Sequence, residues 1–280
     1  MKAQEIFTTD NEQFSSSLDN GILVIREKRH IFHLSQDVSE IFSLYDYLDS
    51  VLSSKAYNAL VMFARSEESL RIEHSRFLSR ILSGDIGDGR FLSSRTFSGD
   101  REIPYLDRFL NLVNKYILSL STLNCMTVFA GQGTVSLFYL NTGLAYDYRI
   151  VAEDTVFENL NLDLGLVTKG SGYFLPRLLG IRKATEVLQW KSFSAEDALQ
   201  LGLVDQIVPV SRLEEATMQL VSGNEAQQLS STLLGIRKLF RCDIKELERS
   251  LELEDNLIKE RLNSEDFRRT FAANRENSAS

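Results

Sequence analysis

Three continuous runs of apolar residues along the chain predict buried β-strands. Residues 21–26, 58–64 and 125–130 read GILVIR, NALVMFA and CMTVFA, and each run has the length of a single strand. In a parallel sheet that carries helices on both faces, the strands are apolar on both sides, as these runs are. Shorter strands are predicted at 148–152, 155–157 and 204–208, and residues 30–34 are a further candidate.

Apolar residues with helical spacing separate these strands. Residues 37–53 and 105–123 carry apolar side chains at intervals of three and four, which predicts amphipathic helices. Because the first helix lies between two predicted strands, we expect a βαβ unit with a right-handed crossover. Ser194 opens the sequence SAED, in which a serine and an acidic residue three positions later predict a capped helix start. Further helices are predicted at 135–146, 174–179, 182–189, 227–240 and 244–262.

Two segments depart from this regular pattern. Residues 1–20 are mostly polar, and residues 66–100 contain glycines and aspartates that are typical of turns. Residues 66–100 are the least regular part of the chain, and long irregular segments inside a compact domain are often functional or mobile. The chain then divides into a polar N-terminal segment at 1–20, an α/β core at 21–210 and a C-terminal helical region at 211–280.

Composition and charge exclude several classes of function. The 280 residues are 43% hydrophobic and 25% charged, which is typical of a soluble globular protein. The formal net charge of −8 argues against a nucleic-acid partner, because phosphate binding needs a basic surface. No apolar run is long enough to cross a membrane, so we predict a cytoplasmic protein. The three histidines and the cysteines Cys125 and Cys242 lack the spacing of metal ligands, and we predict no metal site.

A set of spaced residues in the second half of the chain carries a family resemblance. In order, it comprises Gln132-Gly133, Asp147, Phe157, Gly165, Pro176-Arg177, Gly180 and the sequence FSAEDALQLGLVDQIVP at 193–209. This pattern resembles the crotonase superfamily, the enoyl-CoA hydratase and isomerase group, over residues 20–270. The resemblance implies an α/β fold, a spiral of ββα units whose C-terminal helices pack against neighbouring subunits. It also implies a homotrimer or a dimer of trimers.

The same resemblance implies the ligand and part of the chemistry. The expected ligand is an acyl-CoA or an acyl-carrier thioester, so coenzyme A enters as part of the substrate and no separate cofactor is expected. Two backbone N–H groups are expected to hold the thioester oxygen as negative charge develops on it. By alignment these are the N–H groups of Glu73 and Phe138. The family has small residues at both places, whereas this chain has Ile72 beside the first and Tyr139 beside the second.

The expected catalytic carboxylates are missing from the sequence. The two positions that carry glutamates in hydratases fall on Asn141 and Asn161, and an amide cannot carry a proton back and forth near neutral pH. The position of the single acid in isomerases falls on Lys169. A lysine there is either a base of lowered pKa, an anchor for a phosphate or carboxylate, or a solvated loop residue. Asp163 is the nearest remaining carboxylate.

Four further residues complete the candidate site. The resemblance places Arg71, His74, Gly133 and Ser171 beside the substrate, and His74 is a candidate replacement acid or base. Since isomerisation needs only one mobile proton site, this chain accommodates it more easily than hydration. A second hypothesis remains open. The lost carboxylates and glycines are also typical of a weak or inactive homologue that binds acyl-CoA or acts as an assembly subunit.

Overall fold

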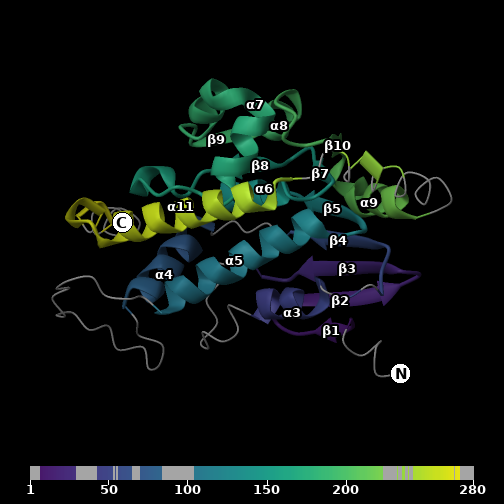
Figure 1. Ribbon diagram of the computed structural model, residues 1–280. Helices are drawn as coiled ribbons and strands as arrows, with labels where there is room; N and C mark the ends of the chain where they lie inside the picture. Colours follow the sequence, from purple (N-terminus) through teal and green to yellow (C-terminus); the bar gives the residue numbers. More distant parts are fainter. Residues whose placement is uncertain are drawn as a thin grey trace.

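The fold is built around one large, mostly parallel β-sheet (Figure 1). The computed structural model describes residues 7–29, 43–64, 70–83, 104–222 and 242–271, apart from 53, 55 and 268, together with isolated positions between 231 and 241. The strands of the sheet, in spatial order, are β1 (Thr9–Asp10), β2 (Phe14–Asp19), β3 (Ile22–Glu27), β4 (Ala59–Phe63), β5 (Met126–Gly131), β7 (Tyr148–Ala152) and β10 (Gln206–Val208). From β3 to β10 all neighbouring strands run parallel.

A smaller sheet and a set of helices complete the described part of the chain. The small sheet contains β6 (Thr134–Ser136), β8 (Val156–Glu158) and β9 (Ser192–Ser194). The helices are α3 (Ser43–Leu52), α4 (Leu70–Ser83), α5 (Pro104–Thr122), α6 (Leu137–Gly143), α7 (Ser171–Val187), α8 (Ala195–Gln200), α9 (Leu213–Val221) and α11 (Ile244–Asn263). Two short 3₁₀ turns are η1 (Leu162–Leu164) and η2 (Val210–Arg212).

Both faces of the main sheet are covered, as the apolar strand runs predict. Leu23 and Leu60 point into the larger core, which includes residues of α3, α5 and α6. Val61 and Val128 point the other way and pack against residues of α9 such as Leu213. The alternation follows from the two-residue period of a strand, and it explains why polar side chains are nearly absent from β4 and β5.

Most of the strongly periodic elements are confirmed. The predicted strands at 21–26, 58–64 and 125–130 correspond to β3, β4 and β5, with boundaries that differ by one residue. Ser194 caps α8, because its hydroxyl accepts from the Asp197 N–H while the Asp197 carboxylate accepts from the Ser194 N–H. The candidate strand at 30–34, the start of the helix at 37–53 and most of the helix at 227–240 lie outside the described residues.

Four sequence predictions are wrong in detail. Residues 14–19 form β2 and pair with β3, so that they belong to the sheet rather than to a separate polar segment. Residues 70–83 form helix α4 within the segment that we expected to be the least regular part of the chain. Helix α6 covers Leu137–Gly143 rather than 135–146, and its start is later because Thr134–Ser136 form β6. Helix α9 was not predicted.

Helix α7 joins two helices that were predicted separately. Between them Gly180 adopts φ 73° and ψ 156°, which breaks the helical path without ending the element. A side chain at this backbone conformation would be strained, so glycine is the residue that fits. The two halves of α7 therefore point in different directions.

Substitution of Leu60 by alanine tests the central position of β4. Leu60 is 0% exposed, and its removal should lower the free energy of unfolding by roughly 3 kcal/mol because a cavity remains. Urea titration followed by circular dichroism measures this loss. The control Leu199→Ala removes a leucine that is 42% exposed and should change stability by less than about 0.5 kcal/mol. Similar losses in both variants would contradict the assigned core.

Candidate functional site

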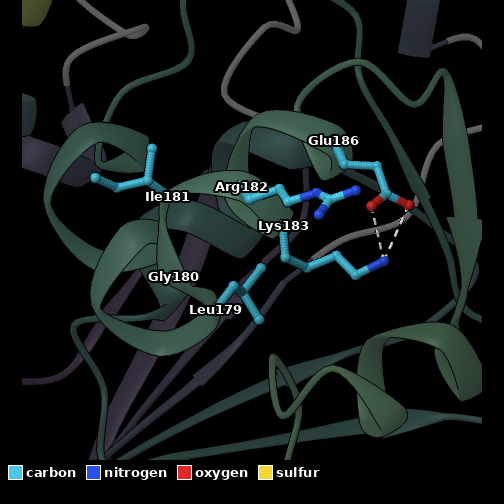
Figure 2. A pocket seen from close by; sticks show the side chains of 6 residues that line it. All are labelled: Leu179, Gly180, Ile181, Arg182, Lys183 and Glu186. Carbon is cyan, nitrogen blue, oxygen red and sulfur yellow. Dashed lines mark hydrogen bonds and ion pairs between the residues drawn. The ribbon is translucent and has the colours of Figure 1, made fainter.

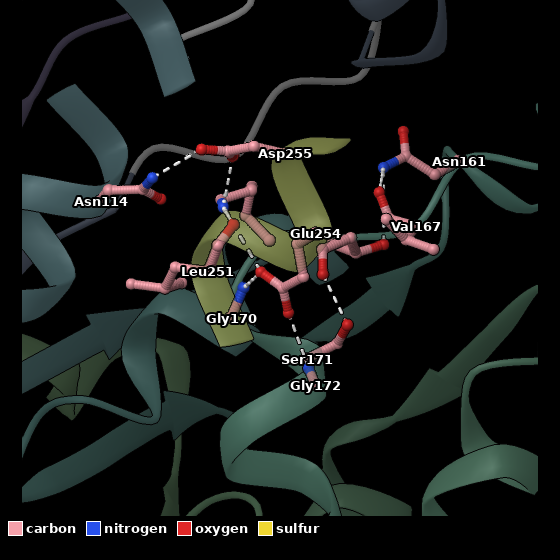
Figure 3. Close-up of polar contacts among 11 residues, drawn as sticks. Asn114, Asn161, Val167, Gly170, Ser171, Gly172, Leu251, Glu254 and Asp255 are labelled. Atoms are coloured by element: carbon pink, nitrogen blue, oxygen red, sulfur yellow. Dashed lines mark hydrogen bonds and ion pairs between the residues drawn. The ribbon is translucent and has the colours of Figure 1, made fainter. Parts of the chain in front are cut away.

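The candidate site lies where α4, α6 and the turn at 161–170 meet. His74 is on the first part of α4, and its side chain hydrogen-bonds with Asn161, which precedes η1. Asn161 also donates through Nδ2 to the carbonyl oxygen of Val167 at 3.1 Å (Figure 3). Asn161 therefore contacts both His74, the predicted acid–base residue, and the backbone of the turn that carries Lys169.

The environment of His74 favours a neutral imidazole. Burial lowers the pKa of His74 to about 4, the hydrogen bond with Asn161 partly opposes this shift, and the positive charge of Arg71 adds to it. Near neutral pH the ring therefore has one nitrogen that donates and one that accepts. A neutral imidazole in this state is able to accept a proton from a substrate carbon or a water molecule.

Asn141 is the most unusual buried polar residue of the site. It lies on α6, it is 0% exposed, and neither its Oδ1 nor its Nδ2 has a hydrogen-bond partner among the described residues. An unpaired buried donor or acceptor costs about 1–3 kcal/mol. Most buried polar groups are paired, so a side chain with both groups unpaired calls for a ligand or a bound water molecule.

Lys169 does not lie at the surface and does not face the two amides. Its side chain is 2% exposed, and its Nζ contacts the Asp255 carboxylate at 2.6 Å, the Leu251 carbonyl at 2.8 Å and the Glu254 carboxylate at 3.5 Å. All three partners lie on α11 (Figure 3). The alternative of a solvated loop lysine is therefore wrong. A role for Lys169 in proton transfer stays a prediction, and it would require the cation to leave two carboxylates.

Glu254 and Asp255 extend this buried cluster to the protein backbone and to α5. The Glu254 carboxylate accepts from the Gly170 N–H at 2.8 Å and from the Gly172 N–H at 2.7 Å. The Asp255 carboxylate accepts from Nδ2 of Asn114 at 2.7 Å. Burial raises the pKa of Glu254, although the charge of Lys169 and the two N–H groups act in the opposite direction.

The two predicted oxyanion donors occupy different positions in their helices. Phe138 is the second residue of α6, where an α-helix directs its N–H groups outward along the axis. Glu73 is the fourth residue of α4. Helix geometry favours the preceding N–H groups of Arg71 and Ile72 as donors in that turn. The side chain of Phe138 stacks on Phe109 of α5 with ring centroids 6.0 Å apart.

The remaining predicted residues lie around the site with local partners. Arg71 is half exposed and pairs with Glu158 at 3.4 Å and with Asp163 at 4.0 Å. Asp163 also pairs with Lys191 at 3.3 Å and is itself exposed. The Ser171 hydroxyl donates to the Thr168 carbonyl at 2.6 Å.

Gly133 lies in a turn between β5 and β6. Its φ of 59° lies in the left-handed region that favours glycine, and its N–H donates to the Asp154 carboxylate at 3.2 Å. Its role in binding substrate stays a prediction.

A separate depression lies at the kink of α7 (Figure 2). It has a volume of about 530 Å³ and is lined by Leu179, Gly180, Ile181, Arg182, Lys183 and Glu186. Lys183 and Glu186 pair with each other at 2.9 Å across it. None of the predicted site residues lines this depression, so we do not assign the site to it.

The sequence analysis missed the acidic residues of α11. Glu254 and Asp255 lie in a helix that is charged throughout, and sequence alone gives no sign that these two are buried. Within the described residues, no group of three or more His, Cys, Asp or Glu side chains is placed to hold a metal ion. No described helix is long and apolar enough to span a membrane.

The sequence of this chain is similar to those of known acyl-thioester proteins. A sequence model described as enoyl-CoA hydratase/isomerase matches residues 107–279. The trans-2-decenoyl-(acyl-carrier-protein) isomerase of Streptococcus mutans is 25% identical over 215 residues, which cover 76% of this chain and 76% of that protein. The fatty acid oxidation complex subunit alpha of Pseudomonas syringae pv. syringae is 34% identical over 110 residues, which cover 39% of this chain and 15% of that subunit.

Solved structures share the fold at low sequence identity. The enoyl-CoA hydratase of Bacillus halodurans has a TM-score of 0.70 and 18% identity, and the match covers 93% of this chain and 99% of that one. An enoyl-CoA hydratase/isomerase of Pseudoalteromonas atlantica has a TM-score of 0.63 and 19% identity, over 95% and 97% of the two chains. The expected α/β fold is confirmed by these matches. The trimerisation role of the C-terminal helices stays a prediction.

The buried His74 leads to a prediction about pH and stability. Its pKa of about 4 in the folded state lies below the ~6.5 of an unfolded histidine, so the unfolded chain binds more protons between these values. Stability should therefore fall as pH decreases from ~6.5 to ~4, by up to about 3 kcal/mol from this residue. Urea titrations at several pH values measure the loss.

The control for this prediction is the His74→Gln variant. It lacks the titrating imidazole and should lose less stability over the same pH range than the unmodified protein. Nuclear magnetic resonance titration of the imidazole provides the direct reading. An imidazole of residue 74 that titrates near pH 6.5 would contradict the assigned burial.

Proposed function

The chain belongs to the enoyl-CoA hydratase/isomerase family of the crotonase superfamily, and we propose that it moves or hydrates the double bond of an acyl thioester. Of these two reactions we favour isomerisation, which needs one proton acceptor rather than two carboxylates. The relative from Streptococcus mutans is by name an isomerase of an acyl-carrier thioester, which supports this choice. Both acyl-CoA and acyl-carrier thioesters are therefore proposed substrates.

The observation that carries this proposal is the unpaired amide of Asn141. Its position corresponds by alignment to a catalytic glutamate, and its Oδ1 and Nδ2 both lack partners among the described residues. A ligand group or water molecule that both donates and accepts would satisfy the amide. We propose that Asn141 binds and orients such a group beside the acyl chain, without transferring a proton itself.

We assign the proton transfer to His74. Isomerisation removes a proton from the carbon next to the double bond and returns one to the far carbon of that double bond, so one neutral base is enough. The neutral imidazole of His74 takes the proton from C2 or C4 of the acyl chain and then donates it to the other carbon. Asn161 fixes the orientation of the ring through its hydrogen bond.

The alternative proton acceptors are less suited to this role. The ammonium group of Lys169 is held by Asp255 and the Leu251 carbonyl, and a protonated amine cannot act as a base. Asp163 is exposed and pairs with Lys191. The enolate oxygen is expected to accept hydrogen bonds from the N–H of Phe138 and from the first turn of α4, where electrostatic stabilisation is typically worth about 3–4 kcal/mol per donor.

One observation favours the second candidate function, an inactive homologue. Phe138 and Tyr139 stand where the family resemblance implies glycines, and both side chains are buried in the core. Phe138 packs on Phe109, and the Tyr139 hydroxyl hydrogen-bonds to the Glu27 carboxylate. If this packing leaves no room for the acyl group, the protein binds or assembles rather than catalyses.

The setting of the reaction remains part of the proposal. We propose that coenzyme A enters only as part of the substrate and that no other cofactor takes part. We further propose a homotrimer or a dimer of trimers in the cytoplasm.

Replacement of Asn141 by leucine separates function from stability. Leucine has a similar size and removes two unpaired polar atoms, so the free energy of unfolding should rise by ~1 kcal/mol or more. Turnover of a decenoyl thioester, measured by product mass, should fall roughly tenfold or more because a substrate hydrogen bond is lost. Lower stability together with full turnover would show that Asn141 is structural.

The matched control for this prediction is Asn159→Leu. Asn159 is also buried, but its Nδ2 donates to the Leu188 carbonyl at 2.9 Å. Its replacement should therefore lower stability and leave turnover per folded molecule unchanged. If no acyl-CoA or acyl-carrier thioester is bound by the unmodified protein in calorimetry, the inactive-homologue function replaces the first proposal.

A further inference from the structure

Helix α11 holds the turn at 164–172 at both of its ends. At one end Nε of Arg261 donates to the Leu164 carbonyl at 2.9 Å. At the other end the Glu254 carboxylate accepts from the Gly170 N–H at 2.8 Å and the Gly172 N–H at 2.7 Å. Residues 254 and 261 are two helical turns apart and lie on the same face of α11. The turn is therefore laid along this face.

Lys169 belongs to the same turn, and its ammonium group contacts α11. Nζ of Lys169 contacts the Asp255 carboxylate at 2.6 Å and the Leu251 carbonyl at 2.8 Å (Figure 3). One buried cation thus faces the two buried carboxylates of residues 254 and 255. Removing one member of such a group leaves an uncompensated buried charge, which makes the arrangement sensitive to single substitutions.

The same turn also approaches Asn141 and Asn161. A Cβ atom at Gly170 would lie 3.1 Å from the backbone carbonyl oxygen of Asn141 and 3.6 Å from its Cβ, so the turn lies close to the backbone of α6 there. Nδ2 of Asn161 donates to the Val167 carbonyl at 3.1 Å. The position of the turn therefore sets the positions of Asn141 and Asn161 relative to one another.

The glycines of the turn permit this close approach. Gly170 has a φ of 78°, which favours glycine, and it fits between Asn141 and the Glu254 carboxylate. A Cβ atom at Gly172 would lie 3.1 Å from Oε1 of Glu254 and 3.0 Å from Oγ of Ser250. The backbone is thus packed tightly against α11, and a small displacement of the carboxylate moves the turn.

We propose that Glu254 is a positioning residue for the acyl-thioester site. Its carboxylate fixes the turn at 164–172 through the Gly170 and Gly172 N–H groups. The turn then holds Asn141 and Asn161 in the correct positions relative to His74. This inference rests on the proposed function, because it assigns Glu254 a role in catalysis without any contact with the substrate. It also gives Lys169 a different task, as the counter-charge that keeps the carboxylate ionised and in place.

The Glu254→Gln variant tests this role with minimal change of shape. A carboxylate accepts from both N–H groups, whereas a carboxamide accepts from one and turns its NH₂ group toward the other. At least one of the bonds to Gly170 and Gly172 should therefore be lost. The matched control is Glu252→Gln, which makes the same charge change at an exposed position of the same helix.

Two measurements read the result. With a decenoyl thioester, kcat of Glu254→Gln should fall roughly 10- to 100-fold while KM stays within about threefold, since misplacement of the reacting groups weakens only the transition state. Hydrogen–deuterium exchange measured by mass spectrometry on peptides spanning 164–174 should become about tenfold faster. Glu252→Gln should change neither quantity.

The outcomes separate the two proposals. Faster exchange with unchanged kcat would overturn the positioning role, because the turn would move without effect on the reaction. Unchanged exchange would overturn it as well. If the unmodified protein turns over no thioester, the proposed function fails and the positioning role in catalysis fails with it, whereas faster exchange in Glu254→Gln would still identify the hold of α11 on the turn.

A second variant covers the case in which Glu254→Gln does not fold. The Glu254→Asp variant keeps the negative charge opposite Lys169 but shortens the side chain by one methylene group, which draws the carboxylate back from the Gly170 and Gly172 N–H groups. It should fold, with the same low kcat and the same faster exchange of peptides spanning 164–174 as expected for Glu254→Gln. Full kcat together with faster exchange in Glu254→Asp would show that the charge of residue 254 alone matters, and would contradict the positioning role.

Discussion

The described site depends on how one buried cation is neutralised. An ammonium group at 2% exposure is too costly to bury alone, and among the described residues Lys169 is compensated by groups on α11. Its partner Asp255 is further held by Asn114 of α5. These contacts join the turn that carries Lys169 to α11 and α5. The same turn lies close to the backbone of Asn141 and accepts a hydrogen bond from Asn161 at Val167.

The exchange of carboxylates for amides changes the chemical character of the site. A carboxylate in place of Asn161 would put a negative charge beside the imidazole of His74 and raise the pKa of that ring. With Asn161 as its neighbour, the pKa of His74 is instead lowered by burial to about 4. The hydrogen bond between His74 and Asn161 therefore joins two uncharged side chains near neutral pH. Charge enters this part of the structure through Arg71, which pairs with Glu158 and Asp163.

The sequence predicted the elements whose signal is local and missed the contacts that join distant segments. Strands β4 and β5 are continuous apolar runs, and the capping box at Ser194 needs only four consecutive residues. The partners of Lys169 could not be predicted, since the bond to Asp255 spans 86 positions and α11 appears uniformly charged. Helix α4 was missed for a different reason: two of its buried positions are the polar residues Glu73 and His74, so the helical spacing of its apolar residues is interrupted in the sequence.

The dependence of the turn on α11 has a consequence for biosynthesis. The Gly170 N–H and the Glu254 carboxylate are separated by 84 residues, so the turn leaves the ribosome well before its acceptor exists. At about 5–20 residues per second, the intervening chain takes roughly 4–17 s to synthesise. During this interval Lys169 and the N–H groups of Gly170 and Gly172 lack the partners that they have on α11 in the folded protein. The nascent chain is therefore accessible to chaperones and proteases until α11 has been synthesised and can pack against the turn.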